Sequence, residues 1–380
     1  MNKFKYFAGV KLRRIDRWLT DQTYQHHRWF RLAASTNQRG VHWPVHLSSR
    51  VQQLATPWPT AETISPIPKI EPVSEQFDRV MDQSAHNIAQ RLLTSDQIPV
   101  VLWSGGIDST AVIVAACRTW PVELLKKLVV VCDSTSIREN AYFYHKIIVP
   151  RFAVIDTDQF GIDQDNYKKF LILDGELGNQ VFGCSTIADL WYRQPDLLCQ
   201  PWSAVPDLQT LLPGSCDLNL ELVLNSMPMC PVDLHTVYDL LWWSNFNFKA
   251  DEVLIKPMFY YGQRLSAQQR QYFYDHCLVR LLEQAPVQIW SMTHLEERRK
   301  QTGIHPKWHL LKYIFDFDQN DLWFAHKHEG ASGSISLRKS PFHRFSNVIG
   351  FDQDWNTVDL ANADLRAQLG QILGRVASPE

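Results

Sequence analysis

Residues 100–110, V-V-L-W-S-G-G-I-D-S-T, combine residue types that suit phosphate binding. Ser104 and two glycines follow an apolar run, and Asp108 and Ser109 then begin a helical pattern. Small residues let successive backbone N–H groups point into one concavity, and a helix N-terminus adds positive potential. A carboxylate beside such a concavity favours a bridging divalent cation. The segment therefore predicts a site for a phosphate-bearing ligand with a metal ion.

The segment differs from the two best-known nucleotide-binding loops. It lacks the G-K-[ST] lysine of the Walker A loop, and the dinucleotide pattern G-x-G-x-x-G is absent. A plain glycine-rich turn capped by Asp108 and Ser109 is the structural alternative. That alternative accounts for some residues of S-G-G-I-D-S but not for all of them, so the ligand site is favoured.

The elements around this segment alternate between strand and helix. Strands are predicted at 99–103, 128–132, 152–155 and 170–173, and helices at 74–92, 108–118 and 140–148. This alternation predicts an α/β fold, a parallel sheet with helices on both faces. The glycine-containing segment would then lie at the carboxyl end of a strand, where open α/β sheets bind ligands.

The second half of the chain predicts a helical portion with a tryptophan-rich core. Its clearest segments are 237–248 and 268–282, whose aromatic residues we expect to be buried. Residues 328–354 predict a loop, and 359–373 predict a last helix. Residues 56–73 contain five prolines and predict an extended linker.

Composition narrows the class of protein. The chain has 380 residues, 45% of them hydrophobic, which is enough for a large core. No apolar run reaches bilayer-spanning length, and the first residues lack a signal-peptide core. The seven cysteines are widely spaced without C-x-x-C, which argues against disulfides, zinc ribbons and iron–sulfur sites. We expect a cytoplasmic protein that does not bind membranes.

The N-terminal segment is strongly basic. Residues 1–50 carry ten Lys/Arg against two Asp/Glu, and aromatic residues are interleaved with them. This composition suits contact with nucleic acid or another acidic partner. The alternative is that the basic segment docks on the acidic remainder of the chain, and the sequence favours that alternative.

The S-G-G-x-D-S segment resembles the signature of the PP-loop ATP pyrophosphatases, which cleave ATP between the α and β phosphates. Three further stretches resemble the synthetase domain of asparagine synthetase and of its relatives that make β-lactams and lasso peptides. These are D-G-E-L-G-N-Q-V-F-G at 174–183, K-P-M-F-Y-Y-G-Q-R-L at 256–265, and His305–Lys312 followed by F-A-H-K-H-E-G. Their order and rough spacing agree across residues 75–330. The resemblance implies the adenine nucleotide alpha hydrolase-like fold.

The resemblance also implies a role for each matching residue. It implies ATP binding by Ser104, Gly105, Gly106, Asp108 and Ser109, and adenine and ribose contacts from Val131, Asp133 and Ser134. Mg²⁺ would be held by Asp108 and Asn179. Glu176 would act as a base on the incoming nitrogen, and Lys327 would neutralise phosphate charge. Lys307 is a second candidate for the lysine role, and a solvated surface lysine is the alternative for Lys327.

Two departures from the family pattern change these expectations. Where relatives have S-D-E, this chain has Gly178, Asn179 and Gln180. An amide oxygen can ligate Mg²⁺ but brings no charge, so we expect weaker metal binding. The chain also starts Met1-Asn2 without the N-terminal cysteine of the family's glutaminase domain. Any ammonia is therefore expected to come from elsewhere.

The predicted organisation is a basic extension with a proline-rich linker at 1–73, a PP-loop synthetase-like domain at 74–330, and a C-terminal extension at 331–380. The predicted function is an ATP-dependent carbon–nitrogen ligase. It would adenylate a small-molecule or peptide carboxylate, release pyrophosphate, and form an amide with an amine or ammonia. Two alternatives stay open. One is a PP-loop enzyme that modifies a tRNA base, for which Cys184 is the only suggestive cysteine. The other is a non-catalytic protein that binds nucleotide or a partner.

Overall fold

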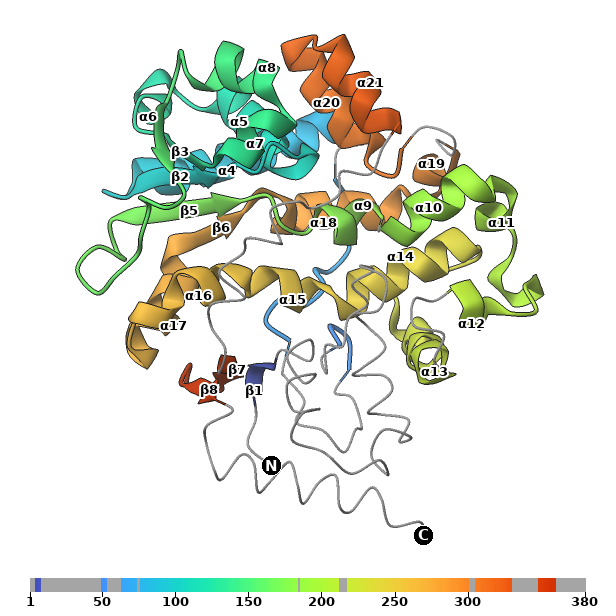
Figure 1. Cartoon of the computed structure of the whole chain (residues 1–380). Coiled ribbons are helices and arrows are strands. Elements are labelled where there is room, and N and C mark those ends of the chain that lie inside the picture. The colour runs from blue at the N-terminus through green and yellow to red at the C-terminus, as the bar shows by residue number, and fades with distance from the viewer. Residues whose placement is uncertain are drawn as a thin grey trace. The chain divides into compact units, whose positions relative to one another are not determined.

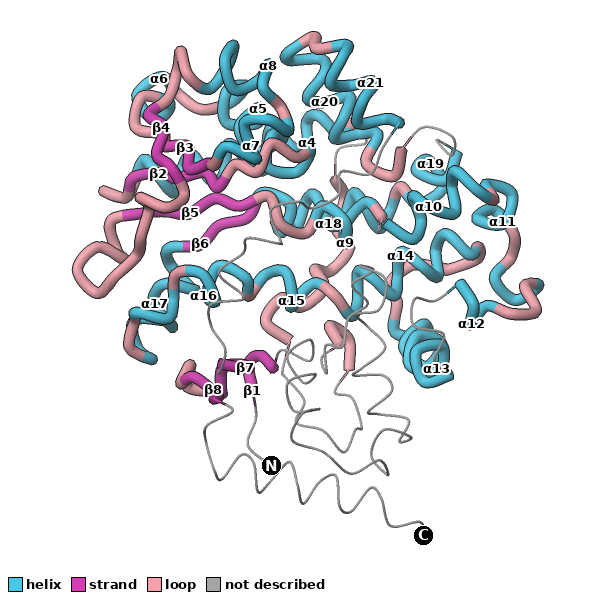
Figure 2. The backbone as a smooth tube through the Cα atoms, in the orientation of Figure 1, coloured by secondary structure: helices cyan, strands magenta, loops and turns pink. Residues whose placement is uncertain are grey.

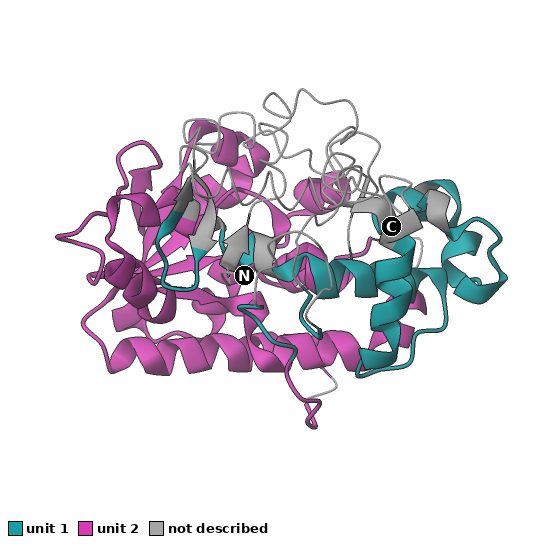
Figure 3. Cartoon of the chain, turned by 90° about the horizontal axis from the view of Figure 1, so that it is seen from below, with its two compact units in different colours: residues 1–67, 183–256, 345–380 teal, residues 68–182, 257–344 magenta. Residues whose placement is uncertain are grey.

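The computed structural model describes residues 4–7, 49–52, 63–73, 76–183, 185–211, 217–300, 305–329 and 348–359. The chain divides into two compact units, coloured separately in Figure 3. Unit 1 comprises residues 1–67, 183–256 and 345–380, and unit 2 comprises 68–182 and 257–344. The predicted domains 1–73, 74–330 and 331–380 stay predictions.

Unit 2 is built on a five-stranded parallel sheet, seen in Figures 1 and 2. In spatial order the strands are β4 (Ala153–Asp156), β3 (Val129–Cys132), β2 (Ile98–Leu102), β5 (Phe170–Asp174) and β6 (Leu278–Arg280). Every neighbouring pair runs parallel. The α/β class predicted from the sequence is confirmed.

The central strands are covered on both faces. In β5, whose sequence is FLILD, Leu171 to Asp174 are all buried, and in β2 Pro99 to Val101 are buried. Successive residues of a strand point to opposite faces, so an unbroken buried run requires packing on each side. Helix α5 (Ile107–Thr119) packs on β2 and β5, and α17 (Ala267–Cys277) packs on β5 and β6.

The other α-helices that surround the sheet of unit 2 vary in length, and α4 is the longest of them. They are α4 (Phe77–Leu93), α6 (Val122–Leu125), α7 (Ser134–Glu139), α8 (Ala141–Phe143), α9 (Gly178–Phe182), α16 (Lys256–Tyr260), α18 (Ala285–Thr293), α19 (Leu295–Lys300), α20 (Trp308–Asp318) and α21 (Asp321–Glu329). Phe77 of α4 packs against the rings of Phe182, Trp290 and Tyr313. An aromatic cluster therefore holds α4, α9, α18 and α20 together.

One helix prediction in unit 2 is confirmed, and another was wrong at its end. The helix predicted at 140–148 is formed by α8 and by the π-helical turn at Tyr144–Ile148 that follows it. Asn140 separates it from α7, which was not predicted, because the Asn140 side chain caps α8 by accepting a hydrogen bond from the N–H of Phe143. The predicted helix at 268–282 ends at Cys277, because residues 278–280 pair with β5 as strand β6.

Unit 1 contains a group of helices and a small antiparallel sheet. The helices are α10 (Ser185–Arg193), α11 (Pro195–Cys199), α12 (Leu208–Leu211), α13 (Asp217–Ser226), α14 (Val237–Phe248) and α15 (Ala250–Leu254). The sheet order is β1 (Phe4–Phe7), β7 (Val348–Asp352) and β8 (Thr357–Asp359). Trp242 and Trp243 of α14 are fully buried, which confirms the aromatic core predicted at 237–248. In the segment 268–282 of unit 2, Phe273 is buried as predicted but Tyr272 is exposed, so that part of the prediction was wrong.

The carboxyl-terminal prediction needs a correction. Strand β7 lies inside residues 328–354, which the sequence predicted as a loop. It pairs with both β1 and β8, so its backbone groups have ladder partners. Most of the predicted helix at 359–373 lies outside the described residues. None of the helices in the described parts of the chain is long and apolar enough to span a bilayer.

Candidate active site

The predicted phosphate-binding segment forms the turn between β2 and α5. Ser104 Oγ lies 3.0 Å from Ser109 Oγ, and the N–H of Ser104 donates to Ser109 Oγ over 3.1 Å. The N–H of Gly106 donates to Ser104 Oγ over 3.4 Å. The two serine hydroxyls therefore fix the shape of the turn at the start of α5, where helix N–H groups are without intrahelical partners.

Position 105 requires a glycine, because of its backbone conformation and its close neighbours. Its φ of +74° lies in the left-handed region, and a Cβ there would be 2.3 Å from the carbonyl oxygen of Ser136. The same Cβ would lie 2.7 Å from Cβ of Glu139. The turn is therefore in close contact with α7, and the glutamate at the end of α7 lies beside it.

A second predicted motif meets the first at Asp108. A Cβ on Gly175 would lie 2.5 Å from the backbone N of Ser109, and one on Gly178 would lie 2.2 Å from Oδ1 of Asp108. Between these glycines Leu177 has a φ of +81° although it is buried. Strained non-glycine backbone of this kind clusters at functional sites. The structure thus brings S-G-G-I-D-S and D-G-E-L-G into direct contact.

Gly178→Ala is expected to destabilise unit 2 by about 1–3 kcal/mol, because the new methyl group would overlap the Asp108 carboxylate. Gly161→Ala is the matched control, since a Cβ at that exposed position meets nothing within 4 Å. We expect it to change stability by less than about 0.5 kcal/mol. Thermal unfolding of the two variants checks this. Equal melting temperatures would contradict the contact.

Lys307 forms an ion pair with Asp108. Its Nζ lies 2.5 Å from Oδ2 of Asp108, and the two side chains are 12% and 25% exposed. Lys307 is the residue before the first turn of α20, and its backbone N–H donates to Nδ1 of His305. Oδ1 of Asp108 is buried and has no hydrogen-bond partner within the described residues. Lys307 is therefore part of this site.

Lys327 is buried beside the turn. Its side chain is 1% exposed, and its Nζ contacts Oε1 of Glu139, which lies next to Gly105. The alternative of a solvated surface lysine is therefore wrong. Burial lowers the pKa of Lys327 to about 8, while the negative charge of Asp108 opposes that change. The contact with Glu139 also favours the charged ammonium.

The residues expected at adenine and ribose lie at the carboxyl end of β3. Val131 is buried, and its carbonyl accepts a hydrogen bond of 2.9 Å from the N–H of Trp103. Asp133 caps α7, with its Oδ1 accepting from the N–H of Ser136 over 2.7 Å. Ser134 is exposed. Val131 lies in β3, the strand next to β2, and Asp133 and Ser134 follow that strand. Their contact with a nucleotide stays a prediction.

Glu176 lies in the turn between β5 and α9 and is half-buried. Its backbone N–H donates to Oδ1 of Asp174 over 3.1 Å. Asn179 is exposed on the first turn of α9, whereas Gln180 is buried. The third motif also reaches this region. Burial raises the pKa of Tyr261, and the charge of Asp174 acts in the same direction, so the two residues are near each other.

The sequence interpretation missed two parts of the site. Glu139 was not predicted, because only the fold brings it to Gly105. The second part is a buried ion pair at the ends of β5 and β6, where Nε of Arg280 lies 3.4 Å from Oδ2 of Asp174. Nη1 of Arg280 also lies 3.2 Å from Oε2 of Glu283. Burial raises the pKa of Asp174 to about 7, which Arg280 opposes. An arginine inside the apolar run L-V-R-L-L was the available signal.

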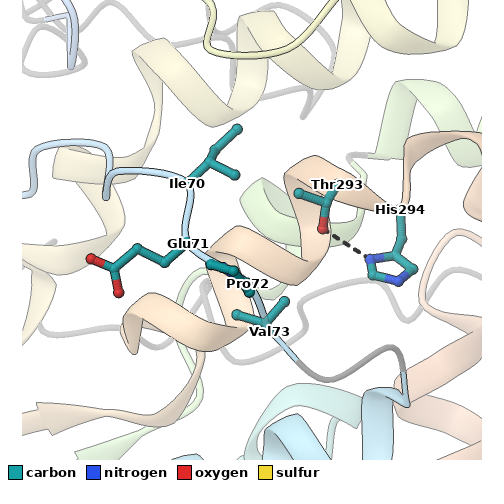
Figure 4. A pocket seen from close by; sticks show the side chains of 6 residues that line it. All are labelled: Ile70, Glu71, Pro72, Val73, Thr293 and His294. Carbon is teal, nitrogen blue, oxygen red and sulfur yellow. Dashed lines mark hydrogen bonds between the residues drawn. The ribbon is translucent and has the colours of Figure 1, made fainter.

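A pocket elsewhere in unit 2 contains none of these residues. It is lined by Ile70, Glu71, Pro72, Val73, Thr293 and His294, drawn in Figure 4. Thr293 Oγ1 lies 3.0 Å from Nδ1 of His294. Three of its lining residues are polar, and in Figure 4 the Glu71 carboxylate points away from Thr293 and His294. Within the described ranges no group of three or more His, Cys, Asp or Glu side chains could hold a metal ion.

Two of the predictions for other partners fall mainly outside the described residues. Cys184 is one of the residues left undescribed, and of the basic segment 1–50 the structure describes only 4–7, 49 and 50. A contact of that segment with nucleic acid therefore stays a prediction.

Comparison of the whole chain with protein-family models, with curated proteins and with solved structures finds no match.

Proposed function

We propose that this chain is an ATP-dependent carbon–nitrogen ligase of the PP-loop type. The observation that carries the proposal is the contact of two motifs with two lysines around one turn. Gly178 lies against Asp108, Lys307 pairs with Asp108, and Lys327 lies with Glu139 beside Gly105. A turn bounded by a helix N-terminus and two ammonium groups suits the phosphates of a nucleotide.

The reaction that fits this arrangement begins at the α-phosphorus of ATP. A carboxylate oxygen of the substrate attacks that atom, the bond to the α–β bridging oxygen breaks, and pyrophosphate leaves. An amine nitrogen then attacks the acyl carbon, and AMP leaves with the carboxylate oxygen. The N–H groups at the start of α5 and the ammonium groups of Lys307 and Lys327 would stabilise the charge of the departing pyrophosphate.

Glu176 would accept the proton that the attacking amine loses. It lies two residues after the end of β5, at the same carboxyl edge of the sheet as the turn 103–106. Its backbone N–H donates a hydrogen bond to Oδ1 of Asp174, which holds the backbone of Glu176 at this edge. The substrates would therefore be a carboxylate and an amine or ammonia, joined in an amide. ATP supplies the energy for that bond.

The resemblance to PP-loop synthetases also implies Mg²⁺ held by Asp108 and Asn179. The residues present do not fit a protein-held Mg²⁺ well. Oδ2 of Asp108 already forms an ion pair with Lys307. Gly178 packs so closely against Oδ1 that a Cβ there would overlap it. Asn179 and Gln180 bring no charge. In the proposed reaction Lys307, Lys327 and the backbone N–H groups at the start of α5 therefore neutralise the phosphate charge.

A pyrophosphate-release screen tests the proposal. The full chain is incubated with ATP, Mg²⁺ in solution and panels of amino acids, small acids and peptides, with and without ammonia. The expected products are AMP and pyrophosphate in equal amounts, formed only when an acid is present. ADP and phosphate as the persistent products would contradict the proposal. Tight ATP binding without turnover for any acid would favour the non-catalytic alternative. The uncharged amides of Asn179 and Gln180 are the sequence feature that supports that alternative.

A further inference from the structure

The space around the Asp108 carboxylate determines which cation it can take. On one side the ammonium of Lys307 lies 2.5 Å from Oδ2. On the other side a single methyl group at Gly178 would come within 2.2 Å of Oδ1. A Mg²⁺ ion demands near-octahedral ligands and keeps several waters, which needs more room than this. The carboxylate therefore has an ammonium partner already and little space for a hydrated ion.

The charges at the turn are balanced by side chains of the chain itself. The ion pair of Asp108 with Lys307 lies at the start of α5, and that of Glu139 with Lys327 lies beside Gly105. Asp108 is also near enough to Lys327 to affect its pKa. Asp108 and Glu139 thus each have a lysine partner. The nearby α9 adds amides at Asn179 and Gln180 and no further carboxylate.

We propose that Lys307 serves as the cation of the Asp108 carboxylate, so that the turn 103–109 binds a triphosphate or pyrophosphate without a divalent ion held by Asp108. This inference rests on the proposed function, because it concerns the same site. An ammonium has three donors, so Lys307 can contact a carboxylate oxygen and a phosphate oxygen together. It also stays attached to the site, so no metal has to be recruited before the nucleotide binds.

Calorimetric titration with α,β-methylene ATP, an analogue that cannot be cleaved between the α and β phosphates, tests this inference. Wild type, Lys307→Met and Lys307→Arg are each titrated in EDTA and again with Mg²⁺. Lys312→Met is the matched control, because Lys312 lies on the same helix α20 but is exposed and paired with Asp316. We expect wild type, Lys307→Arg and Lys312→Met to bind with affinities that agree within about threefold in the two buffers.

Lys307→Met is expected to lose about tenfold or more in affinity in EDTA, and Mg²⁺ is expected to restore most of it. Removing the ammonium opens Asp108 to the metal, so this variant should become metal-dependent. Since Lys307 is partly exposed, we expect the variant to fold, and its melting temperature checks that. If it does not fold, the titrations of wild type and Lys307→Arg in the two buffers still show whether the nucleotide binds without a divalent ion.

Three outcomes would overturn the inference, and they separate it from the proposed function. Wild-type binding only in Mg²⁺ overturns the inference and leaves the proposed function intact. A loss in Lys307→Met that Mg²⁺ does not restore shows that lysine and metal are not interchangeable at Asp108. Absence of binding to folded wild type in both buffers overturns the inference and the proposed function together.

Discussion

Replacing Arg280 with methionine is expected to destabilise unit 2 by about 3–5 kcal/mol at pH 8, because it leaves the buried Asp174 carboxylate without its cation. Both side chains are almost fully buried, at 3% and 6% exposure. Urea unfolding followed by tryptophan fluorescence measures the loss. Arg264→Met is the matched control, since Arg264 is exposed in the same unit, and we expect it to cost less than about 0.5 kcal/mol.

The pH dependence of this effect follows from the titration of Asp174. Its pKa is about 7 in the folded protein against 3.8 for an ordinary aspartate. Between these values the folded state holds a proton that the unfolded state has lost, so wild-type stability falls as pH rises from about 4 to about 7. Asp174→Asn should remove this slope. A cost of Arg280→Met that is as large at pH 5 as at pH 8 would contradict the ionic explanation.

The double variant Asp174→Asn with Arg280→Met separates charge from packing. Without the carboxylate there is no unpaired buried charge, so the double variant should be more stable at pH 8 than Arg280→Met alone. Equal stability of the single and double variants would mean that lost packing, and not the unpaired charge, causes the effect.

Lys327→Met is expected to lower kcat/KM for pyrophosphate release by about 100-fold or more, because it removes a buried positive charge from the place where we propose that pyrophosphate leaves. The assay uses ATP and the acid that the screen identifies. Lys300→Met serves as the control, since Lys300 is an exposed lysine paired with Glu296 in α19. We expect that control to keep wild-type activity.

Wild-type activity should also fall as pH rises through about 8. Burial lowers the pKa of Lys327 to about 8, so its ammonium, the form that would bind phosphate, is lost above that pH. Lys327→Arg, which stays charged, should move this fall to higher pH if the guanidinium fits. Full activity in Lys327→Met would exclude Lys327 from the reaction.

The fold class could be predicted because the strands of unit 2 carry clear local signals. The apolar runs at Ile98–Leu102, Val129–Cys132 and Phe170–Asp174 lie within a residue or so of their predicted positions. Strand β6 could not be predicted, because Leu278–Arg280 continues the apolar pattern of α17. Only the open edge of β5 makes those residues a strand. The pairing of these residues with β5 therefore overrides their local preference for helix.

The site was predictable where its residues form compact motifs and not where the fold assembles it. Ser104 to Ser109 and Gly175 to Gly178 each belong to a recognisable run, and the structure brings the two runs into contact. Glu139 has no such run, since it ends α7, a short helix that the sequence did not predict. The pairing of Asp108 with Lys307 joins residues far apart in the sequence, so only the structure could show it.

The central claim is that the chain transfers AMP to a carboxylate. The most direct test uses the accepted acid labelled with ¹⁸O in its carboxylate, with the products of ATP analysed by ³¹P NMR. If the carboxylate attacks the α-phosphorus, AMP should carry one ¹⁸O from the acid and should appear together with unlabelled pyrophosphate. AMP without the label, or ADP and phosphate in its place, would contradict the claim.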